Sequence, residues 1–467
     1  MVALANSSVF RCSVAAFLVL GSVFLSADPV SGKGDDTYRF VQGAGETSSL
    51  KLDAISGGVR WLWARPTDSK WDTALLGLRL HAVEGEKGEP WVEFSAGSTR
   101  VRQYLERGVQ GLRWLNLTGL RERFAIGQPV EVVGHGVTIA LEAATLRLFS
   151  NRLDPKERIL ILATHPDDAE IAAFGLYAGR NATIVTITCG NAGDANYADH
   201  FRDSAEQYRF KGYLRAVDSV TVPWQGGISP AHCFNLGYFD DRLQDMHEKP
   251  SEAVPERYSS NVDISVYRRA NMGDLLGKGM RTNSWAHLVA DLAEVFRKVR
   301  PTLIVMPHPV LDTHRDHDFT SVAAVEALEM CDTVTKGSPR LKSPKLMLYT
   351  NHAGKELYPY GPAGTSAPLP PWQGRELLIE GFYAHPLDTD LQRRKLFALD
   401  CMHDLRLSPA EQIACAGGSV KPRREDFPRV PAVDYFRRAP RPEELFFIFS
   451  RGGLRKLIRT FLEELKD

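Results

Sequence analysis

The sequence lacks the features of a disulfide-rich, zinc-ribbon or strongly charged protein. It has six cysteines among 467 residues, and no two of them form a Cys-x-x-Cys pair, which argues against a structural zinc ribbon. The formal net charge is zero, from 57 basic and 57 acidic side chains, so we expect no nucleic acid as a partner. A hydrophobic content of 43% is ordinary for a globular chain, and the length suggests about two or three domains.

An apolar run occupies residues 14–25 (VAAFLVLGSVFL), after Arg11 and before small residues. A run of about 7–15 apolar residues is typical of an export signal, and a membrane span needs about 20. We therefore predict a signal peptide over residues 1–30, with an uncleaved anchor or a buried element as alternatives. The protein would then be periplasmic, or membrane-anchored and facing the envelope. Disulfides are permitted there, but the spacing of Cys401 and Cys415 does not fix a pairing.

Residues 36–150 show the alternation of β-strands. Apolar and other residues alternate at positions 59–63 (VRWLW), 76–80 (LGLRL) and 137–141 (VTIAL), with glycine-rich breaks between such runs. This pattern predicts an all-β, sandwich-like accessory domain.

Five of the eight tryptophans fall in this region. Their rings could stack on sugars, which would make the region a carbohydrate-binding domain. Aromatic side chains dominate core burial, however, so we expect most of the five to fill a core. The five are Trp61, Trp63, Trp71, Trp91 and Trp114.

Beyond residue 155 the pattern changes to alternating strands and helices. Short apolar runs are typical of parallel strands buried on both faces, and helical patterns follow at residues 169, 285 and 319. We predict a Rossmann-like, doubly wound parallel α/β domain over residues 155–410. The runs are 159–163 (ILILA), 182–188 (ATIVTIT), 219–222 (SVTV), 302–306 (TLIVM) and 345–349 (KLMLY).

Two further segments have no place in that alternation. Residues 225–283 lack clear periodicity, and so long a connection is usually functional or disordered; we interpret it as a substrate-facing insertion or lid. Residues 411–467 form a C-terminal extension that ends in an amphipathic helix at 454–465. Such a helix can rest on a membrane surface, but it more often docks on its own domain.

Histidines and aspartates gather directly after two of the predicted strands. Residues 164–170 (THPDDAE) follow the strand at 159–163, and residues 312–317 (DTHRDH) follow the strand at 302–306. Ligand sites of open α/β sheets form beyond the carboxyl ends of the strands. The two segments can supply three metal ligands and leave a carboxylate and an imidazole unligated, as metal-assisted hydrolases require. The competing interpretation of Asp168 is a helix cap.

The order of these motifs resembles the PIG-L/LmbE family of zinc-dependent de-N-acetylases. The resemblance extends over residues 155–405, and it includes residues 188–193 (TCGNAG) and the pair Arg300-Pro301. It implies a Rossmann-like fold, one Zn2+ per chain (or another divalent metal), and removal of acetyl groups from N-acetylglucosamine-type sugars. Four positions resemble the closing helix of the family: Lys395, Ala398, Leu399 and His403.

The resemblance also implies a role for individual residues. The metal ligands are His165, Asp168 and His317. Asp167 is the general base that activates water, and His314, as a cationic imidazole, stabilises the oxyanion or protonates the leaving amine.

Asp316 is expected to orient His314. Weaker candidates for substrate contacts are Asn191, Asp194 and Arg202, which could equally be surface loop residues. We expect His308 and Asp312 to be outer partners of the metal ligands. We expect His352 and His385 to occupy packing or surface positions.

The sequence departs from the family pattern in two places. Ala169 stands where the family often has Glu, and Glu170 follows it; the glycines expected soon afterwards are replaced by residues 174–177 (FGLY). The second departure leaves the shape of the substrate open.

The substrate is therefore expected to be an N-acetylhexosamine in a cell-surface glycolipid or polysaccharide, with possible membrane association of the protein through its N-terminus. Two alternatives remain: an amidase acting on a sugar-linked small metabolite, and a non-catalytic sugar-binding envelope protein.

Overall fold

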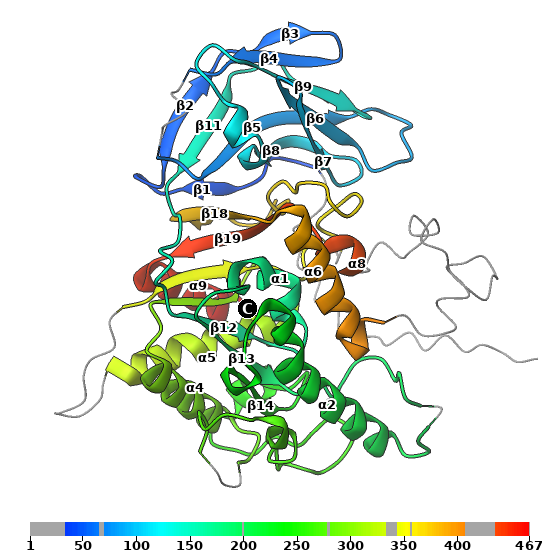
Figure 1. The fold of residues 1–467 in the computed structure, drawn as a ribbon, viewed down its shortest axis with the longest axis vertical. Helices are drawn as coiled ribbons and strands as arrows, with labels where there is room; N and C mark the ends of the chain where they lie inside the picture. The colour runs from blue at the N-terminus through cyan, green and yellow to red at the C-terminus, as the bar shows by residue number, and fades with distance from the viewer. Residues whose placement is uncertain are drawn as a thin grey trace, which may run out of the picture.

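The computed structural model describes residues 33–64, 70–198, 200–277, 281–332, 343–354, 357–406 and 435–466. Paired β-sheets stack on a mixed α/β part (Figure 1). The predicted signal peptide and Cys415 lie outside the described residues. No helix within the described ranges is long and apolar enough to cross a membrane.

The N-terminal part consists of two five-stranded sheets that share one core. Alternate residues of each strand point into that core, for example Leu76 and Leu78 from one sheet and Phe94 and Val132 from the other. The first sheet contains β10 (Val137–Ile139), β5 (Thr73–Ala82), β11 (Ala144–Phe149) and β2 (Glu46–Leu50), with β8 (Gln110–Asn116) paired to β5. The second contains β3 (Asp53–Ile55), β4 (Gly58–Leu62), β9 (Pro129–His135), β6 (Trp91–Ala96) and β7 (Thr99–Tyr104).

Four of the five tryptophans of this region are buried, as the core-filling interpretation predicts. Trp63, for example, stacks on Phe124 with ring centroids 3.9 Å apart. Trp91 is half-buried, but His135 stacks on it at 3.6 Å and the Arg102 guanidinium lies 4.7 Å from its ring. The tryptophans therefore offer little open ring surface to a sugar.

The α/β part is built on a seven-stranded sheet of order β14-β13-β12-β15-β16-β19-β18. The first five strands are parallel, whereas β19 is antiparallel to both β16 and β18. The predicted α/β class is confirmed, but the sheet is mixed rather than wholly parallel. The strands are β12 (Ile159–Ala163), β13 (Ala182–Thr188), β14 (Cys233–Tyr238), β15 (Leu303–Pro307), β16 (Lys345–Tyr349), β18 (Gly381–Pro386) and β19 (Glu443–Phe449).

Helices cover both faces of this sheet. On β12, Leu160 and Leu162 pack with α4, α5 and α9, and Ile159 and Ile161 pack with α1 and α6. A central strand buried on both faces explains why its sequence is apolar throughout. The helices are α1 (Asp168–Tyr177), α2 (Ser204–Thr221), α3 (Leu243–Glu248), α4 (Trp285–Val299), α5 (Arg315–Asp332), α6 (Thr389–Cys401), α8 (Tyr435–Arg438) and α9 (Arg451–Glu464).

One predicted strand is wrong. Residues 219–222 lie at the end of helix α2, and the third parallel strand is β14, inside the segment interpreted as an insertion. Ala216 and Val220 are four residues apart and both buried, which is helical spacing. A four-residue apolar run is too short for its period to separate strand from helix, so the β-branched residues were misleading.

The C-terminal segment is integrated into the α/β part. It supplies β19, which lies between β16 and β18, although its sequence is distant from both. The amphipathic helix α9 buries Leu454, Leu457, Ile458 and Phe461, and the Phe461 ring lies 6.0 Å from that of Phe319 in α5. The helix therefore docks on its own domain, as the more common alternative predicts.

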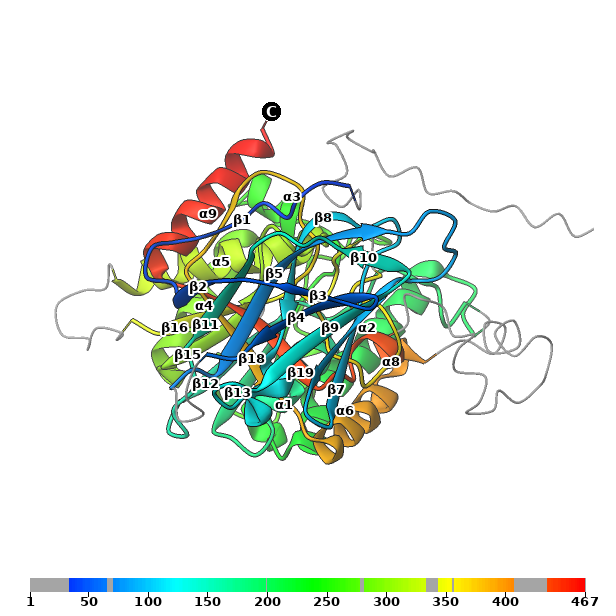
Figure 2. The same ribbon diagram turned by 90° about the horizontal axis from the view of Figure 1, so that it is seen from above.

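Strand pairing and buried charge join the two parts. Strand β1 (Tyr38–Phe40) pairs in parallel with β17 (Leu377–Ile379). At the same junction the Arg113 guanidinium is buried between Asp36, at 3.7 Å, and Glu106, at 2.6 Å. From above, the N-terminal strands lie over β18 and β19 of the larger sheet (Figure 2). The N-terminal part is thus fixed on the sheet rather than tethered to it.

Candidate metal centre

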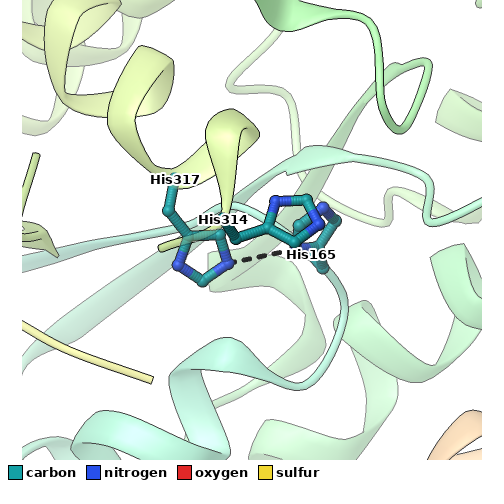
Figure 3. A group of neighbouring side chains, drawn as sticks. All are labelled: His165, His314 and His317. Atoms are coloured by element: carbon teal, nitrogen blue, oxygen red, sulfur yellow. Dashed lines mark hydrogen bonds between the residues drawn. The ribbon is translucent and has the colours of Figure 1, made fainter. Parts of the chain in front are cut away.

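The two histidine- and aspartate-rich segments meet at one edge of the sheet. The first connects β12 to α1, and the second connects β15 to α5. Strands β12 and β15 are parallel neighbours, so their carboxyl ends open on the same side. His317 lies in the first turn of α5 and faces His165 (Figure 3).

Three donor atoms form a compact triangle in the buried centre of the site. His165 Nδ1 lies 3.2 Å from His317 Nε2, and Asp168 Oδ2 lies 3.4 Å and 3.1 Å from those two atoms. Four ligands at tetrahedral positions around zinc, about 2.0–2.1 Å from it, are themselves about 3.3 Å apart. The triangle therefore fits one face of a zinc tetrahedron, and these are the three predicted ligands.

Each ligand side chain has a carboxylate or amide partner behind its donor atom. His165 Nε2 lies 2.9 Å from Asp240 Oδ1, and His317 Nδ1 lies 3.1 Å from Asp312 Oδ2. Metal-bound histidines usually have such a carboxylate partner. Asn351 Nδ2 donates to Asp168 Oδ1 over 2.7 Å and leaves Oδ2 toward the triangle.

The centre is strongly anionic. Burial by itself lowers the pKa of a histidine, but the nearby Asp168 and Asp312 carboxylates outweigh burial and raise the pKa of His317 to about 10. Burial likewise opposes protonation of His165, but Asp240 and Asp168 raise its pKa well above the ordinary value. A site that stabilises positive charge on both rings is suited to a divalent cation.

Asp167 is held apart from the triangle. It is the N-cap residue of α1 and makes no side-chain capping bond, and its φ of 126° is a strained conformation for a residue with a Cβ. The Arg215 Nη2 atom lies 3.0 Å from its Oδ2 atom. Burial raises the pKa of Asp167 to about 7, against the opposing effect of Arg215. The helix-cap interpretation of Asp168 is also wrong, because Asp168 is the first helical residue.

Gly190 makes room for Arg215. The Arg215 guanidinium also donates to the backbone carbonyls of Pro166 and Gly190. Gly190 has a φ of +68°, and a Cβ there would lie 2.5 Å from Arg215 Nη1. The glycine that follows β13 therefore permits the ion pair with Asp167.

The surroundings of His314 favour a neutral imidazole over the cationic form that the sequence predicts. Burial and the neighbouring His165 and His317 lower its pKa. Its Nδ1 accepts from the backbone N–H of Asp316 over 3.3 Å, so the ring hydrogen is placed on Nε2. A neutral imidazole of this tautomer can still donate to an oxyanion.

The Asp316 carboxylate does not orient His314. It accepts from the backbone N–H groups of Asp241 and Leu243, over 2.6 Å and 3.1 Å. Asp316 therefore fixes the loop after β14, which carries Asp240. The spacing His-x-Asp-His does not reveal this, because the partner loop is far away in sequence.

The weaker candidates divide into two groups. Asn191 is buried, and its Oδ1 accepts from the backbone N–H of Asp240 over 3.0 Å, so it holds the partner of His165 rather than a substrate. Asp194 and Arg202 are exposed on the loop between β13 and α2. His308 Nδ1 accepts from two backbone N–H groups of its own turn, so His308 shapes that turn.

Glu170 is a structural residue beside the site. It is buried and accepts from the Tyr177 hydroxyl over 2.9 Å. Burial raises its pKa to about 8, although the Tyr177 hydrogen bond opposes the shift. Ala169 stands where the family often has Glu, and the neighbouring Glu170 bonds Tyr177 rather than a donor of the triangle. The replacement therefore leaves the triangle intact.

The Glu170→Gln variant is expected to be more stable than the wild type at pH 8 and equally stable at pH 4. A folded-state pKa of about 8 means that the folded protein binds this proton more tightly than the unfolded chain does. The stability contribution of the group therefore falls as pH rises from about 4.5 to 8, by about 1–4 kcal/mol. Urea unfolding of the metal-free protein at both pH values measures the difference. The exposed control Glu122→Gln should not alter it, and an unchanged pH dependence in Glu170→Gln would contradict the expectation.

These features define a class of protein: a mixed α/β protein with a buried His–Asp–His set at adjacent strand ends, suited to a divalent metal. Residues 160–328 match the sequence profile of the PIG-L family, described as GlcNAc-PI de-N-acetylase. The family resemblance is thereby confirmed over residues 160–328.

Weak likenesses to solved structures include the following three. The GalB 4-carboxy-2-hydroxymuconate hydratase of Pseudomonas putida KT2440 is 15% identical, with a TM-score of 0.33 over 62% of this chain and 95% of that chain. The conserved protein TT1542 of Thermus thermophilus is 17% identical, with a TM-score of 0.27 over 53% and 78%. A deacetylase of teicoplanin biosynthesis, in complex with teicoplanin, is 17% identical, with a TM-score of 0.26 over 63% and 98%. No curated protein matches this chain.

Proposed function

We propose that this protein is a zinc-dependent hydrolase that removes the N-acetyl group of an N-acetylhexosamine in a cell-surface glycan or glycolipid. One observation carries the proposal: three donor atoms lie 3.1–3.4 Å apart, and the next residue in sequence to one of them is a buried carboxylate, Asp167, which pairs with Arg215 instead. The PIG-L profile over residues 160–328 supports amide hydrolysis on a sugar-like substrate.

His165, Asp168 and His317 would hold the metal. Two imidazole nitrogens and one carboxylate oxygen are the donor set of many catalytic zinc sites, with other divalent metals as alternatives. When bound, the metal supplies a Lewis acid that polarises the acetyl carbonyl and lowers the pKa of water.

Asp167 and His314 would move the protons. Asp167 accepts the proton of the attacking water, and its pKa of about 7 is close to the value that serves a general base at neutral pH. Arg215 keeps that carboxylate in place. His314 Nε2–H is available to the negative charge that develops on the carbonyl oxygen, and the proton taken up by Asp167 can pass to the leaving amine.

The test is release of acetate by the zinc-loaded protein. N-acetylglucosamine, its short oligosaccharides and N-acetylglucosaminyl-phosphatidylinositol would be incubated with it, and acetate and free amine would be quantified separately. We expect equal amounts of both products from at least one of them, and none from the corresponding O-acetylated sugar. A protein that binds zinc but releases acetate from none of these compounds would refute the proposal.

We further infer that residues 155–410 and β19 form one Rossmann-like domain. We also infer that the protein is exported. The apolar run at residues 14–25 supports export. N-terminal sequencing of the protein isolated from its native cells tests this. A mature chain that begins near residue 30 in the envelope fraction is expected, and full-length protein in the cytoplasm would contradict it.

A further inference from the structure

Three charged side chains of helix α2 form one buried face. Lys211, Arg215 and Asp218 are four and three residues apart, which is the spacing of one side of a helix, and all three are buried. The turn η5 (His403–Leu405), which follows α6, packs against α2 (Figure 1). The three charges must find partners in this turn or in neighbouring loops, because a buried charge without a partner is costly.

His403 and Asp404 of the turn supply such partners. His403 Nδ1 lies 2.8 Å from Asp218 Oδ1, and the backbone N–H of His403 donates to Asp218 Oδ2 over 3.0 Å. The next residue, Asp404, receives both cations. Its Oδ1 lies 3.1 Å from Lys211 Nζ, and its Oδ2 lies 3.3 Å from Arg215 Nη1. One carboxylate thus bridges two side chains that are one helical turn apart.

Arg215 connects Asp404 to the proposed base. Its Nη2 atom lies 3.0 Å from Asp167 Oδ2, while its Nη1 atom faces Asp404. The guanidinium is planar and rigid, so carboxylates at its two Nη atoms fix its orientation. Asp404 therefore holds Arg215 through the nitrogen that Asp167 does not use.

Lys211 connects Asp404 to a different part of the site. Its Nζ atom donates to the Asp194 carbonyl over 2.9 Å and to Asn196 Oδ1 over 3.3 Å, in addition to its contact with Asp404. The three N–H groups of the ammonium therefore have three acceptors. Two of these acceptors lie in the loop at residues 190–198. This loop follows β13, whose carboxyl end opens at the same edge of the sheet as that of β12.

We propose that Asp404 is a positioning residue of the active site. Through Arg215 it holds the base, Asp167, and through Lys211 it holds the loop at residues 190–198. This proposal rests on the proposed function. The base governs the chemical step, whereas a loop beside the centre governs how well the sugar is held. A change at Asp404 should therefore alter both kcat and KM, and changes at its two cations should separate the two effects.

The experiment compares Asp404→Asn, Lys211→Met and Arg215→Lys with wild type. An Asn side chain can offer its oxygen to one cation only and turns its amino group toward the other. Met keeps the length of Lys without its charge, and Lys keeps the charge of Arg without its fork of donors. Asp400→Asn is the control, because Asp400 is an exposed acid in the last turn of α6.

Three measurements are made on the zinc-loaded proteins. The first is zinc content, and the second is kcat and KM for acetate release. The third is hydrogen exchange of the backbone amides at residues 193–198, followed by mass spectrometry of peptides from this loop. Exchange reports local opening of the loop and requires no turnover.

We expect the zinc content of every variant to equal that of the wild type. In Asp404→Asn, kcat should fall about 10-fold and KM should rise, with faster exchange at residues 193–198. Lys211→Met should raise KM and speed the exchange at nearly unchanged kcat. Arg215→Lys should lower kcat about 10-fold at nearly unchanged KM and exchange. Asp400→Asn should behave as wild type.

Three results would overturn the inference. Wild-type kcat, KM and exchange in Asp404→Asn would show that its carboxylate holds neither part. Zinc lost from Asp404→Asn would give this residue a role in the fold of the whole centre. Equal changes of kcat and KM in Lys211→Met and Arg215→Lys would show that the two cations do not act separately. If wild-type protein releases no acetate from any substrate, the proposed function fails, and the exchange rates still decide whether Asp404 holds the loop.

Discussion

The Asp167→Asn variant should retain its zinc and lose about 10²–10⁴-fold in kcat. Asp167 is not one of the three donors of the triangle, so an isosteric amide at this position leaves the proposed metal ligands unchanged. The amide cannot accept the proton of the attacking water, because its oxygen is far less basic than a carboxylate. Arg215, 3.0 Å away, can still bond the amide oxygen, so the loop should keep its place.

Two controls separate lost chemistry from lost structure. Asp388→Asn changes another N-cap aspartate, which accepts from Leu391 at the start of α6 and which Asn can replace; it should match wild type in zinc and in kcat. The acid limb of the wild-type pH profile is the second control. Activity should rise with pH as Asp167 loses its proton, at or below about 7 because a bound cation lowers its pKa. Substantial activity in Asp167→Asn, with the same limb, would assign the base to another residue.

The sequence was sufficient to predict the donor triangle because its three residues lie in the segments that follow strands β12 and β15. The apolar runs place β12 and β15 side by side, and the ends of parallel neighbours must open at one edge. His317 follows from the same argument, since α5 begins immediately after His314. Chain order and strand pairing therefore bring these donor atoms together with little help from the rest of the fold.

The partners behind the ligands could not be predicted in that way. Asp240 follows β14, a strand that lies in a segment without periodicity, and Asn351 has no motif of its own. Only the pairing of β14 with β13, and of β16 with β15, brings these side chains to the edge. Two acidic residues after residues 233–238 were the available signal for Asp240.

Long-range pairing also explains why Tyr435 and His352 were not expected to meet at the metal centre. The Tyr435 hydroxyl lies 3.2 Å from His352 Nδ1, and the His352 ring centroid lies 4.9 Å from that of His317. Tyr435 lies 83 positions from His352, on a short helix that precedes β19. Strand β19 inserts between β16 and β18, so it carries the preceding helix to the end of β16. A sequence pattern shows the period of a strand but does not show which other strands pair with that strand. The segment interpreted as a C-terminal extension is therefore part of both the sheet and the site.

The His317→Ala variant should lose both its zinc and its activity. It removes one of three donor atoms and leaves Asp168 and Asp312, 3.1 Å from the ring nitrogens, without that partner. The loss of metal affinity should exceed the roughly 10–100-fold that follows removal of an outer partner. Elemental analysis after dialysis against a zinc-free buffer measures it, with about one zinc per chain expected for the wild type.

A graded series makes this result specific to the donor triangle. Asp312→Asn keeps all three ligands but weakens the carboxylate partner of His317, so it should bind zinc about 10–100-fold more weakly and still fill at high zinc. His232→Ala removes an exposed histidine and should retain full zinc. Thermal unfolding of the metal-free proteins checks that each variant folds. If His317→Ala folds and holds as much zinc as the wild type, the metal lies elsewhere. In that case the triangle would be only a buried cluster of histidines and carboxylates, and the roles proposed for Asp167 and His314 would have no metal to act beside.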